Sequence, residues 1–260
     1  MIPLIDGDVL RYEIGHKCQG DLGPLHFDKV AECIDNDIAA ICRGAGADEA
    51  PVIFLTGKEN FRDGIAVSKP YKGNRKSEKP FHWENITAYL WNQYEVRLVE
   101  GLEADDLMAI EQVGWMGSDQ ETIICTRDKD LRMVPGWHYG WECGAQREFG
   151  PLFADIIGDI ELDREKKPPK LSGYGLKFFY AQLLMGDSVD NIPGLPRCGA
   201  VKAYDVLHDA DTEAVMFERV RTEYEMKGYG DDYLLEQGQL LWMTQELTEE
   251  GKPKLWQFPE

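Results

Sequence analysis

Carboxylate side chains stand at the ends of three separate apolar segments of the sequence, or just after them. The segments are MIPLID at residues 1–6, VRLV at residues 96–99 and ETIICT at residues 121–126. The acids concerned are Asp6, Asp8, Glu103, Asp105, Asp106, Asp128 and Asp130. If the segments are parallel strands, these acids meet at one sheet edge, where like charges repel unless a cation lies among them. Oxygen ligands select hard cations such as Mg²⁺ or Mn²⁺, and two ions about 4 Å apart suit phosphodiester hydrolysis.

Two more carboxylates open a turn-rich stretch late in the chain. GDSVDNIPGLPRCGAVKA, residues 186–203, carries Asp187 and Asp190, then a Pro-Gly turn and a second turn, and a helix is expected to start at residues 199–203. Backbone N–H groups at a helix start, exposed by glycines, bind phosphate without reading base sequence. From the residues alone, the stretch is either a surface connector or a device for gripping an anion.

The chain is acidic overall, with a net charge of −19, but its charge is unevenly distributed. The segment from Lys58 to Pro80 holds seven Lys or Arg residues and three acids. A net negative charge argues against a nucleic-acid partner, whereas a local basic segment beside a metal site suits a phosphodiester substrate.

Strands and helices alternate through the first two thirds of the chain. Strands are expected at residues 1–6, 51–56, 96–99 and 121–126, with short aromatic strands around 137–149, and helices at 26–43, 83–94 and 102–116. Apolar strands alternating with helices predict an α/β fold with a mostly parallel central sheet and helices on both faces. DREKKPPK at residues 163–170 is expected to be a linker or mobile loop, and the chain after it to be helical. The predicted division is therefore 1–165 for the α/β core, with a basic loop or arch at 58–80, and 166–260 for the helical region.

Composition restricts the class of protein further. The 260 residues are 43% hydrophobic, enough to bury a sizeable core, and no stretch approaches the roughly 20 apolar residues of a membrane span. The first residues lack the basic and apolar regions of a signal peptide. The six cysteines have no CxxC spacing, which favours reduced thiols in a cytoplasmic protein over zinc ligands.

In their order, the motifs IDGD, YKGNRK, LEADD, TRDKDL and GDSVDNIPGLPRCGAVKA resemble those of the 5′-nuclease superfamily, over about residues 2–207. This family includes flap endonucleases, the 5′–3′ exonuclease domain of bacterial DNA polymerase I and stand-alone 5′–3′ exonucleases of tailed phages, which the chain resembles most. The resemblance implies a PIN-like 5′-nuclease core and a helix-turn-helix variant that binds duplex DNA. It also implies a monomeric, magnesium-dependent or manganese-dependent enzyme, using two ions, that hydrolyses DNA near 5′ ends, flaps or nicks. The RNA strand of RNA–DNA hybrids is a further expected substrate, no membrane partner is expected, and a phage-encoded protein would act in the host cytoplasm.

The resemblance also assigns roles to single residues. Lys72 and Arg75 would approach the scissile phosphate as catalytic residues together with Asp128 and Asp130, and Tyr71 would stack on a terminal base. The expected metal ligands are Asp6, Glu103, Asp105, Asp106, Asp128 and Asp130 for the first ion, and Asp187 and Asp190 for the second. The expected DNA contacts are Tyr71, Lys72, Arg75, Lys76, Gly194, Arg197, Gly199 and Lys202, with a potassium ion on carbonyls of the turn.

The sequence departs from the family pattern at two places. Gly57 stands near the position of a further acid after the second strand, and Pro196-Arg197-Cys198-Gly199 replaces a glycine–apolar–glycine turn. Asp8 fits a turn residue and a ligand equally well. Two other functions stay open: a non-catalytic, structure-specific DNA-binding protein of the same fold, and a metal-dependent nuclease that acts on RNA.

Overall fold

The computed structural model describes residues 1–20, 23–75 and 78–259, and the chain divides into two compact units. Unit 1 comprises Met1–Glu59, Ser77–Leu131 and Gly136–Phe153. Unit 2 comprises Asn60–Lys76, Arg132–Pro135 and Ala154–Glu260.

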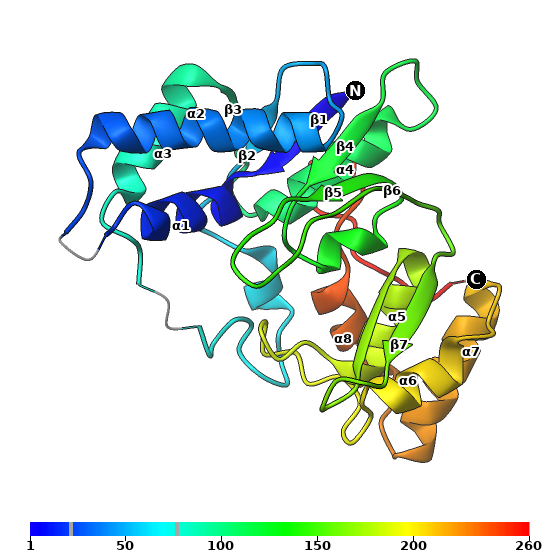
Figure 1. The fold of residues 1–260 in the computed structure, drawn as a ribbon. Helices are drawn as coiled ribbons and strands as arrows, with labels where there is room; N and C mark the ends of the chain where they lie inside the picture. The colour runs from blue at the N-terminus through cyan, green and yellow to red at the C-terminus, as the bar shows by residue number, and fades with distance from the viewer. Residues whose placement is uncertain (21–22, 76–77, 260) are drawn as a thin grey trace. The chain divides into compact units, whose positions relative to one another are not determined.

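A six-stranded sheet forms the centre of unit 1 (Figure 1). Its strands are β1 (Ile2–Asp6), β2 (Val52–Phe54), β3 (Glu95–Arg97), β4 (Thr122–Cys125), β5 (Gly136–Gly140) and β6 (Phe149–Ala154). They lie in the order β3-β2-β1-β4-β5-β6, and the pairs from β3 through β5 are all parallel. In the central strand Ile5 pairs with Ile53 on one side and Cys125 on the other. The predicted mostly parallel sheet is confirmed.

Helices cover both faces of this sheet. The helices of unit 1 are α1 (Gly7–Lys17), α2 (Phe27–Gly44), α3 (Trp83–Gln93) and α4 (Ala104–Trp115). One apolar core joins α1, α2 and α3 to alternate sheet residues such as Ile5, Ile53 and Ile123. Helix α4 contacts β1 and β4 with residues outside that core, which places it on the opposite face. Helix α1 was not predicted, whereas α2, α3 and α4 lie close to their predicted bounds.

Unit 2 is a small hairpin followed by helices. Strands β7 (Asp159–Asp163) and β8 (Lys170–Tyr174) pair antiparallel, and the helices are α5 (Gly175–Met185), α6 (Ala200–Leu207), α7 (Glu213–Met226) and α8 (Asp231–Leu241). Helix α5 is buried along most of its length because α6, α7, α8 and both hairpin strands contact it. The C-terminal helical region is confirmed, with a helix–loop–helix formed by α5, residues 186–199 and α6.

The expected linker at residues 163–170 is instead the turn of this hairpin. Asp163 and Lys170, its first and last residues, are paired across the two strands. Pro168 and Pro169 lie between them, outside the ladder, where a missing N–H removes no strand pairing. The prediction was wrong because a charged, proline-containing stretch also suits a tight connection between two short strands.

The first part of the basic segment is anchored in unit 2. The buried guanidinium of Arg62, in the short helical turn η1 (Phe61–Gly64), donates to the carbonyls of Leu240 at 3.1 Å and Trp242 at 2.7 Å. The N–H groups of Val67 and Ser68 donate to Glu236 Oε1 at 2.7 and 2.6 Å. Residues 60–76 therefore group with the C-terminal helices, whereas the division expected from the sequence placed 58–80 on the core.

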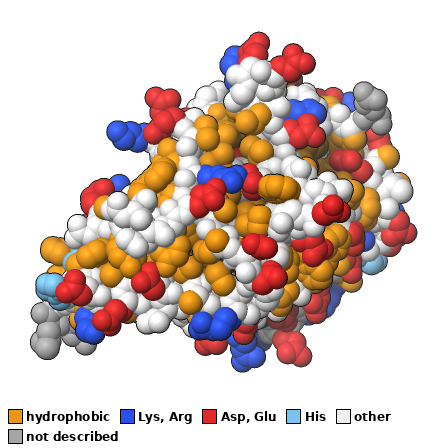
Figure 2. All heavy atoms as spheres, turned by 90° about the horizontal axis from the view of Figure 1, so that it is seen from above, with side chains coloured by type: hydrophobic (Ala, Val, Ile, Leu, Met, Phe, Trp, Pro, Cys, Tyr) orange, Lys and Arg blue, Asp and Glu red, His pale blue; other side chains and the backbone are white. Residues whose placement is uncertain are grey.

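Acidic side chains are prominent on the surface, as expected from the net charge of −19. On the face drawn in Figure 2, Asp and Glu side chains are widely spread and Lys and Arg side chains lie among them in small groups. Within the described parts of the chain, no helix is both long and apolar enough to cross a membrane.

Candidate metal and nucleic-acid site

A threonine hydroxyl joins the carboxyl ends of β1 and β4. Thr126 Oγ1 donates to Asp6 Oδ2 at 2.7 Å and accepts from the backbone N–H of Asp128 at 3.0 Å. Asp6 Oδ1 caps α1 by accepting from the N–H groups of Asp8 and Val9 at 3.1 and 3.0 Å. Two predicted site acids, Asp6 and Asp128, are thus linked through one buried side chain. Sequence reasoning missed Thr126, although it is the last residue of the segment ETIICT.

Electrostatic repulsion is concentrated at Asp6. The pKa of its carboxyl is raised to about 7, first by burial and then by the negative charge of Asp8, with Asp128 adding a smaller rise. Hydrogen bonds from the Val9 N–H and the Thr126 hydroxyl act in the opposite direction. A bound divalent cation offsets the repulsion between carboxylates that lie close together in a buried environment.

Asp8 holds the ends of β1 and β2 together. Its Oδ1 forms an ion pair with the Arg11 guanidinium, and its Oδ2 accepts from the backbone N–H of Thr56 at 3.2 Å. The guanidinium in turn lies 4.0 Å from the centre of the Trp83 ring. Asp8 therefore has a structural role at the strand ends, which the sequence alone left undecided against a ligand role.

Glu103 is the N-cap residue of α4, and Asp105 and Asp106 lie in its first turn. Glu103 and Asp106 make a capping box in which each side chain accepts from the other residue's backbone N–H. Thr56 Oγ1 accepts from the N–H of Ala104 at 2.9 Å, so the end of β2 fixes the start of this helix. Both boxed carboxylates are buried, and Asp105 in the same turn is partly exposed. Thr56 was also missed by sequence reasoning, and like Thr126 it ends an apolar segment.

Asp130 continues the chain of contacts from Asp128. Its N–H donates to Asp128 Oδ1 at 2.8 Å, and its Oδ1 lies 2.6 Å from Lys129 Nζ. Among residues 1–20, 23–75 and 78–259, no three His, Cys, Asp or Glu side chains are arranged as a ready-made metal site. The donor set suits a hard cation chemically, although Lys129 pairs with one of its carboxylates, Asp130, and Arg11 pairs with the neighbouring Asp8.

The space beside Gly57 contains a carboxylate from another strand end. A Cβ atom at position 57 would lie 2.5 Å from Glu100 Oε2, and the N–H of Lys58 donates to the same oxygen at 2.8 Å. Glu100 follows β3 and thus brings an acid to the end of β2, where the sequence has glycine. No local pattern in the sequence signals this approach, because the two segments are more than forty residues apart.

In unit 2, the basic loop (residues 70–75) lies on the acidic turn (residues 187–192). The Asp190 carboxylate contacts Arg75 Nη2 at 2.5 Å, Lys72 Nζ at 3.8 Å and the Tyr71 hydroxyl at 3.0 Å. Asp187 Oδ1 accepts from the N–H groups of Val189 at 2.7 Å and Asp190 at 3.3 Å, which closes the turn. The structure thus brings the predicted basic pair onto one of the two predicted second-metal acids.

Tyr71 is packed inside unit 2. Tyr71 is only 8% exposed, and Arg62 and Lys72 lie over its ring at 5.9 and 5.0 Å from the ring centre. In this conformation the ring is not exposed for stacking on a base, which is a departure from the sequence expectation. Lys76, the other predicted contact of this segment, lies outside the described residues.

The predicted duplex-binding turn divides into an inner and an outer part. Gly194 is inner: its N–H donates to Gln237 Oε1 at 2.9 Å, and its carbonyl accepts from the Tyr233 hydroxyl at 3.0 Å. It is buried against Gly186, where a Cβ atom on Gly194 would clash with the Gly186 backbone. Gly194 therefore has a packing role, and its N–H is directed at Gln237 rather than outwards.

Arg197, Gly199 and Lys202 form the outer part. Arg197 and Gly199 are exposed, and nothing lies within 4 Å of a Cβ built on Gly199 at the start of α6. Lys202 Nζ lies 2.5 Å from Glu223 Oε1 on α7, and this bond raises the pKa of the lysine ammonium. A phosphate at the start of α6 would therefore compete with Glu223 for Lys202.

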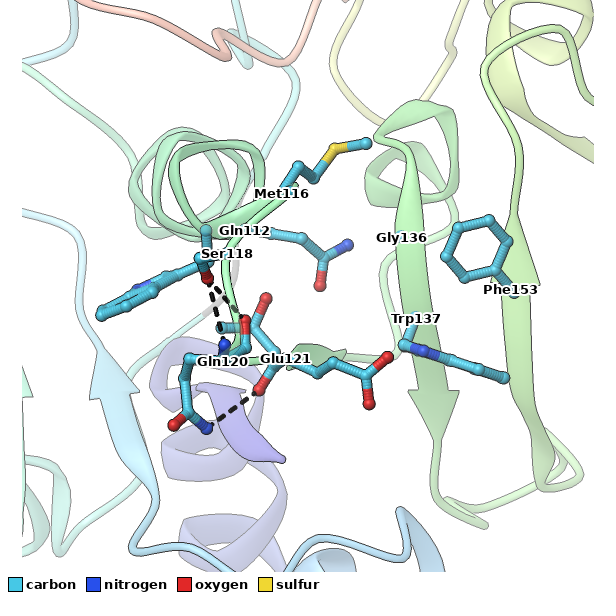
Figure 3. A pocket seen from close by; sticks show the side chains of 11 residues that line it. Gln112, Met116, Ser118, Gln120, Glu121, Gly136, Trp137 and Phe153 are labelled. Atoms are coloured by element: carbon cyan, nitrogen blue, oxygen red, sulfur yellow. Dashed lines mark hydrogen bonds between the residues drawn. The ribbon is translucent and has the colours of Figure 1, made fainter.

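A hollow in unit 1 lies at the opposite edge of the sheet from the acids. Its volume is about 180 Å³, and it is bounded by the amino ends of β4 and β5 and the end of α4. Figure 3 shows Gln112 reaching into it, with Trp137 and Phe153 along one side at 5.3 Å between ring centres. The hollow is largely apolar and is separate from the residues discussed above.

Sequence comparison finds relatives among DNA-processing proteins. The chain is 29% identical over 187 residues to DNA polymerase I of Bacillus subtilis, which covers 66% of this chain and 19% of that protein. It is 28% identical over 171 residues to a 5′–3′ exonuclease of Buchnera aphidicola, covering 60% of this chain and 51% of the relative. The match thus extends over about half or less of these relatives' own lengths. No protein-family model matches the chain.

The fold has counterparts among solved structures. The flap endonuclease of bacteriophage T5, in a complex with DNA and metal ions, superposes with a TM-score of 0.58 at 14% identity. The match covers 91% of this chain and 86% of that one. The T5 5′-exonuclease with bound zinc gives a TM-score of 0.56 at 15% identity, over 93% of this chain and 86% of the other. Sequence relatives and shared fold together confirm the resemblance to the 5′-nuclease superfamily that the motifs indicate.

Proposed function

We propose that the chain is a divalent-metal-dependent nuclease that hydrolyses DNA phosphodiester bonds near 5′ ends, as an exonuclease and at flaps. The observation that carries this proposal is the group of mutually repelling carboxylates at the ends of β1 and β4, centred on Asp6, whose pKa is raised to about 7. The similarity to a 5′–3′ exonuclease and to DNA polymerase I supports the same activity.

The predicted acids at the strand ends are the proposed ligands of a first ion, Asp187 and Asp190 of the acidic turn are the proposed ligands of a second, and the proposed ion is Mg²⁺. The ions would supply Lewis-acid activation of water and charge stabilisation at the leaving oxygen. The protein's own part is to hold the carboxylates: Thr126 orients Asp6 and Asp128, and Thr56 fixes the helix that carries Glu103. The ion pairs of Arg11 with Asp8 and of Lys129 with Asp130 limit the repulsion among the acids at this edge.

Lys72 and Arg75 would neutralise charge that develops on the reacting phosphate. The Asp190 carboxylate forms ion pairs with the Lys72 ammonium and the Arg75 guanidinium. A phosphate, which is also an oxygen anion, would form the same kind of ion pair with both cations. The substrate would therefore take over contacts that already exist, which limits the side-chain ordering needed on binding.

The outer part of the α5–α6 connection is the proposed grip on duplex DNA. The open space at Gly199 admits close approach of a backbone phosphate to the α6 N-terminus, and Arg197 and Lys202 add charge. A potassium ion on the turn carbonyls would have to compete with the Lys227 ammonium, which lies 2.5 Å from the Pro196 carbonyl. The RNA strand of a hybrid is proposed as a second substrate, and the enzyme is proposed to act as a single chain.

The proposal is tested by incubating the protein with a 5′-labelled flap, a nicked duplex, an RNA–DNA hybrid and a single-stranded RNA. Each substrate is supplied with Mg²⁺, with Mn²⁺, with Ca²⁺ or with EDTA. Cleavage of flap and nicked DNA is expected in Mg²⁺ and in Mn²⁺ but not in EDTA, with duplex binding and no cleavage in Ca²⁺. Binding without cleavage in Mg²⁺ and Mn²⁺ would favour a non-catalytic DNA-binding protein, and preferential cutting of RNA would favour the RNA-directed alternative.

A further inference from the structure

We propose that Asn74 and Asn191 are positioning residues that hold the basic loop on the acidic turn and so determine where Lys72 and Arg75 stand. The inference rests on the proposed function, because it concerns the two cations that would meet the phosphate. Neither asparagine contacts the reacting atoms in this assignment. Both act through the backbone of the opposite segment.

The two segments exchange side-chain hydrogen bonds reciprocally. Asn74 Nδ2, in the basic loop, donates to the carbonyl of Ser188 at 2.7 Å. Asn191 Nδ2, in the acidic turn, donates to the carbonyl of Pro70 at 2.8 Å. Between them, the N–H of Lys72 donates to the carbonyl of Asp190 at 2.9 Å. The loop is therefore fixed near both of its ends and at the lysine itself.

The backbone conformation of two residues at this contact supports a role for the contact in positioning the loop. Lys72 and Asn191 have φ values of 52° and 62°, in the left-handed region that L-residues other than asparagine and aspartate rarely adopt. Such conformations persist when the surroundings impose them, and they cluster at functional sites. Lys72 has this conformation while its own N–H donates to the carbonyl of Asp190 in the acidic turn.

A metal ion or a phosphate competes with the ion pairs of Asp190 but not with the hydrogen bonds of the two asparagines. Asp190 contacts Lys72 and Arg75 through its carboxylate, and either a metal ion or a phosphate would displace those ion pairs. The asparagine bonds are neutral and end on backbone carbonyls, so they persist when the two cations turn to a phosphate. They can therefore keep the loop in place at the step where the ion pairs are exchanged.

The loop can be tested without DNA or metal, because trypsin cuts after Lys72 and Arg75. Three single variants are compared with wild type in EDTA: Asn74→Ala, Asn191→Gly and Asn92→Ala. Glycine at 191 removes the donor while tolerating the positive φ. Asn92 is the matched control, since its amide donates at 2.8 Å to Ala88 within its own helix. Each loop variant is expected to be cut at these two sites about fivefold faster, the effect of one neutral hydrogen bond, and the control at the wild-type rate.

A second measurement separates positioning from simple stability. On a 5′ flap in Mg²⁺, the loop variants are expected to show a single-turnover rate at saturating protein that is lower by about fivefold or more, with duplex affinity in Ca²⁺ unchanged. Wild-type protease rates in both loop variants would overturn the proposal. Faster proteolysis with an unchanged single-turnover rate would overturn the positioning role. If wild type cuts no nucleic acid, the proposed function fails, while the protease rates still decide whether these asparagines hold the loop.

Discussion

Replacing Thr126 with valine tests whether this hydroxyl organises the acidic edge of the sheet. Valine keeps the branched shape of threonine but removes two hydrogen bonds, the one given to Asp6 and the one received from the Asp128 N–H. Thr126 is 1% exposed and its bond to Asp6 is buried, so water does not readily replace that bond, whereas the bond from the Asp128 N–H is only partly buried.

The expected decrease in stability follows from these two bonds. An N–H left without its acceptor costs about 1–3 kcal/mol when buried, and the partly buried N–H of Asp128 belongs at the low end of that range. Removal of a bond to a carboxylate costs about 1.5–3 kcal/mol. Because the Asp6 pKa is about 7, its carboxyl is partly protonated near neutrality, and the bond to it belongs in the lower half of its range. The valine variant is therefore expected to be destabilised by about 3 kcal/mol, and Thr126→Ser, which keeps the hydroxyl and removes one methyl group, by about 1 kcal/mol.

The assay is urea unfolding of the metal-free protein, followed by calorimetric titration with Mn²⁺ at one pH. Groups that orient metal ligands commonly change metal affinity by about 10- to 100-fold, so valine should weaken Mn²⁺ binding by about tenfold or more and serine much less. A valine variant whose unfolding free energy is within about 0.5 kcal/mol of wild type, and which binds Mn²⁺ equally well, would refute the role given to Thr126.

Three further predictions concern charges of the proposed site. The raised Asp6 pKa means that the folded protein holds a proton more tightly than the unfolded chain between about pH 4 and pH 7, so this group's contribution to stability falls as pH rises through that window. We therefore expect the free energy of unfolding of wild type minus that of Asp6→Asn, measured in EDTA, to decrease from about pH 5 to about pH 8. A difference that does not change with pH would contradict this prediction. Glu223→Gln should tighten binding to duplex DNA in Ca²⁺ because it releases Lys202, whereas equal affinity would mean that Lys202 meets no phosphate. In that background, Lys202→Ala should reduce the slope of log affinity against log salt by about 0.9 for each phosphate that the lysine neutralises, as a salt series would measure.

The strands and their acids could be predicted because both depend on local pattern. A segment such as ETIICT has a continuous apolar centre, as buried parallel strands require, and the acids that follow such strands lie at the same edge of the sheet. Helix α1 was missed because it starts at Gly7 directly after a strand and lacks a clear apolar stripe. The hairpin at 159–174 was missed because its prolines and charged residues suggested a linker rather than a turn.

The contacts that orient the site could not be predicted, because they join segments far apart in the sequence. Thr126 reaches Asp6 across 120 residues, Glu100 approaches Gly57 from the neighbouring strand end, and Asn74 meets a carbonyl 114 residues away. Threonine and asparagine are common at strand ends and in loops for local reasons, so their presence alone does not indicate such bonds.

Single-turnover cleavage of a 5′-labelled flap by wild type and Asp128→Asn, each in Mg²⁺, tests the assignment of a catalytic metal site most directly. Duplex binding is measured in Ca²⁺ for both proteins. We expect cleavage by wild type, a rate lowered by about a thousandfold or more in the variant, and equal binding, since removing one charge from a repelling group does not disturb the fold. Full turnover by Asp128→Asn, or wild-type cleavage that persists in EDTA, would contradict the assignment of these carboxylates to a catalytic metal site.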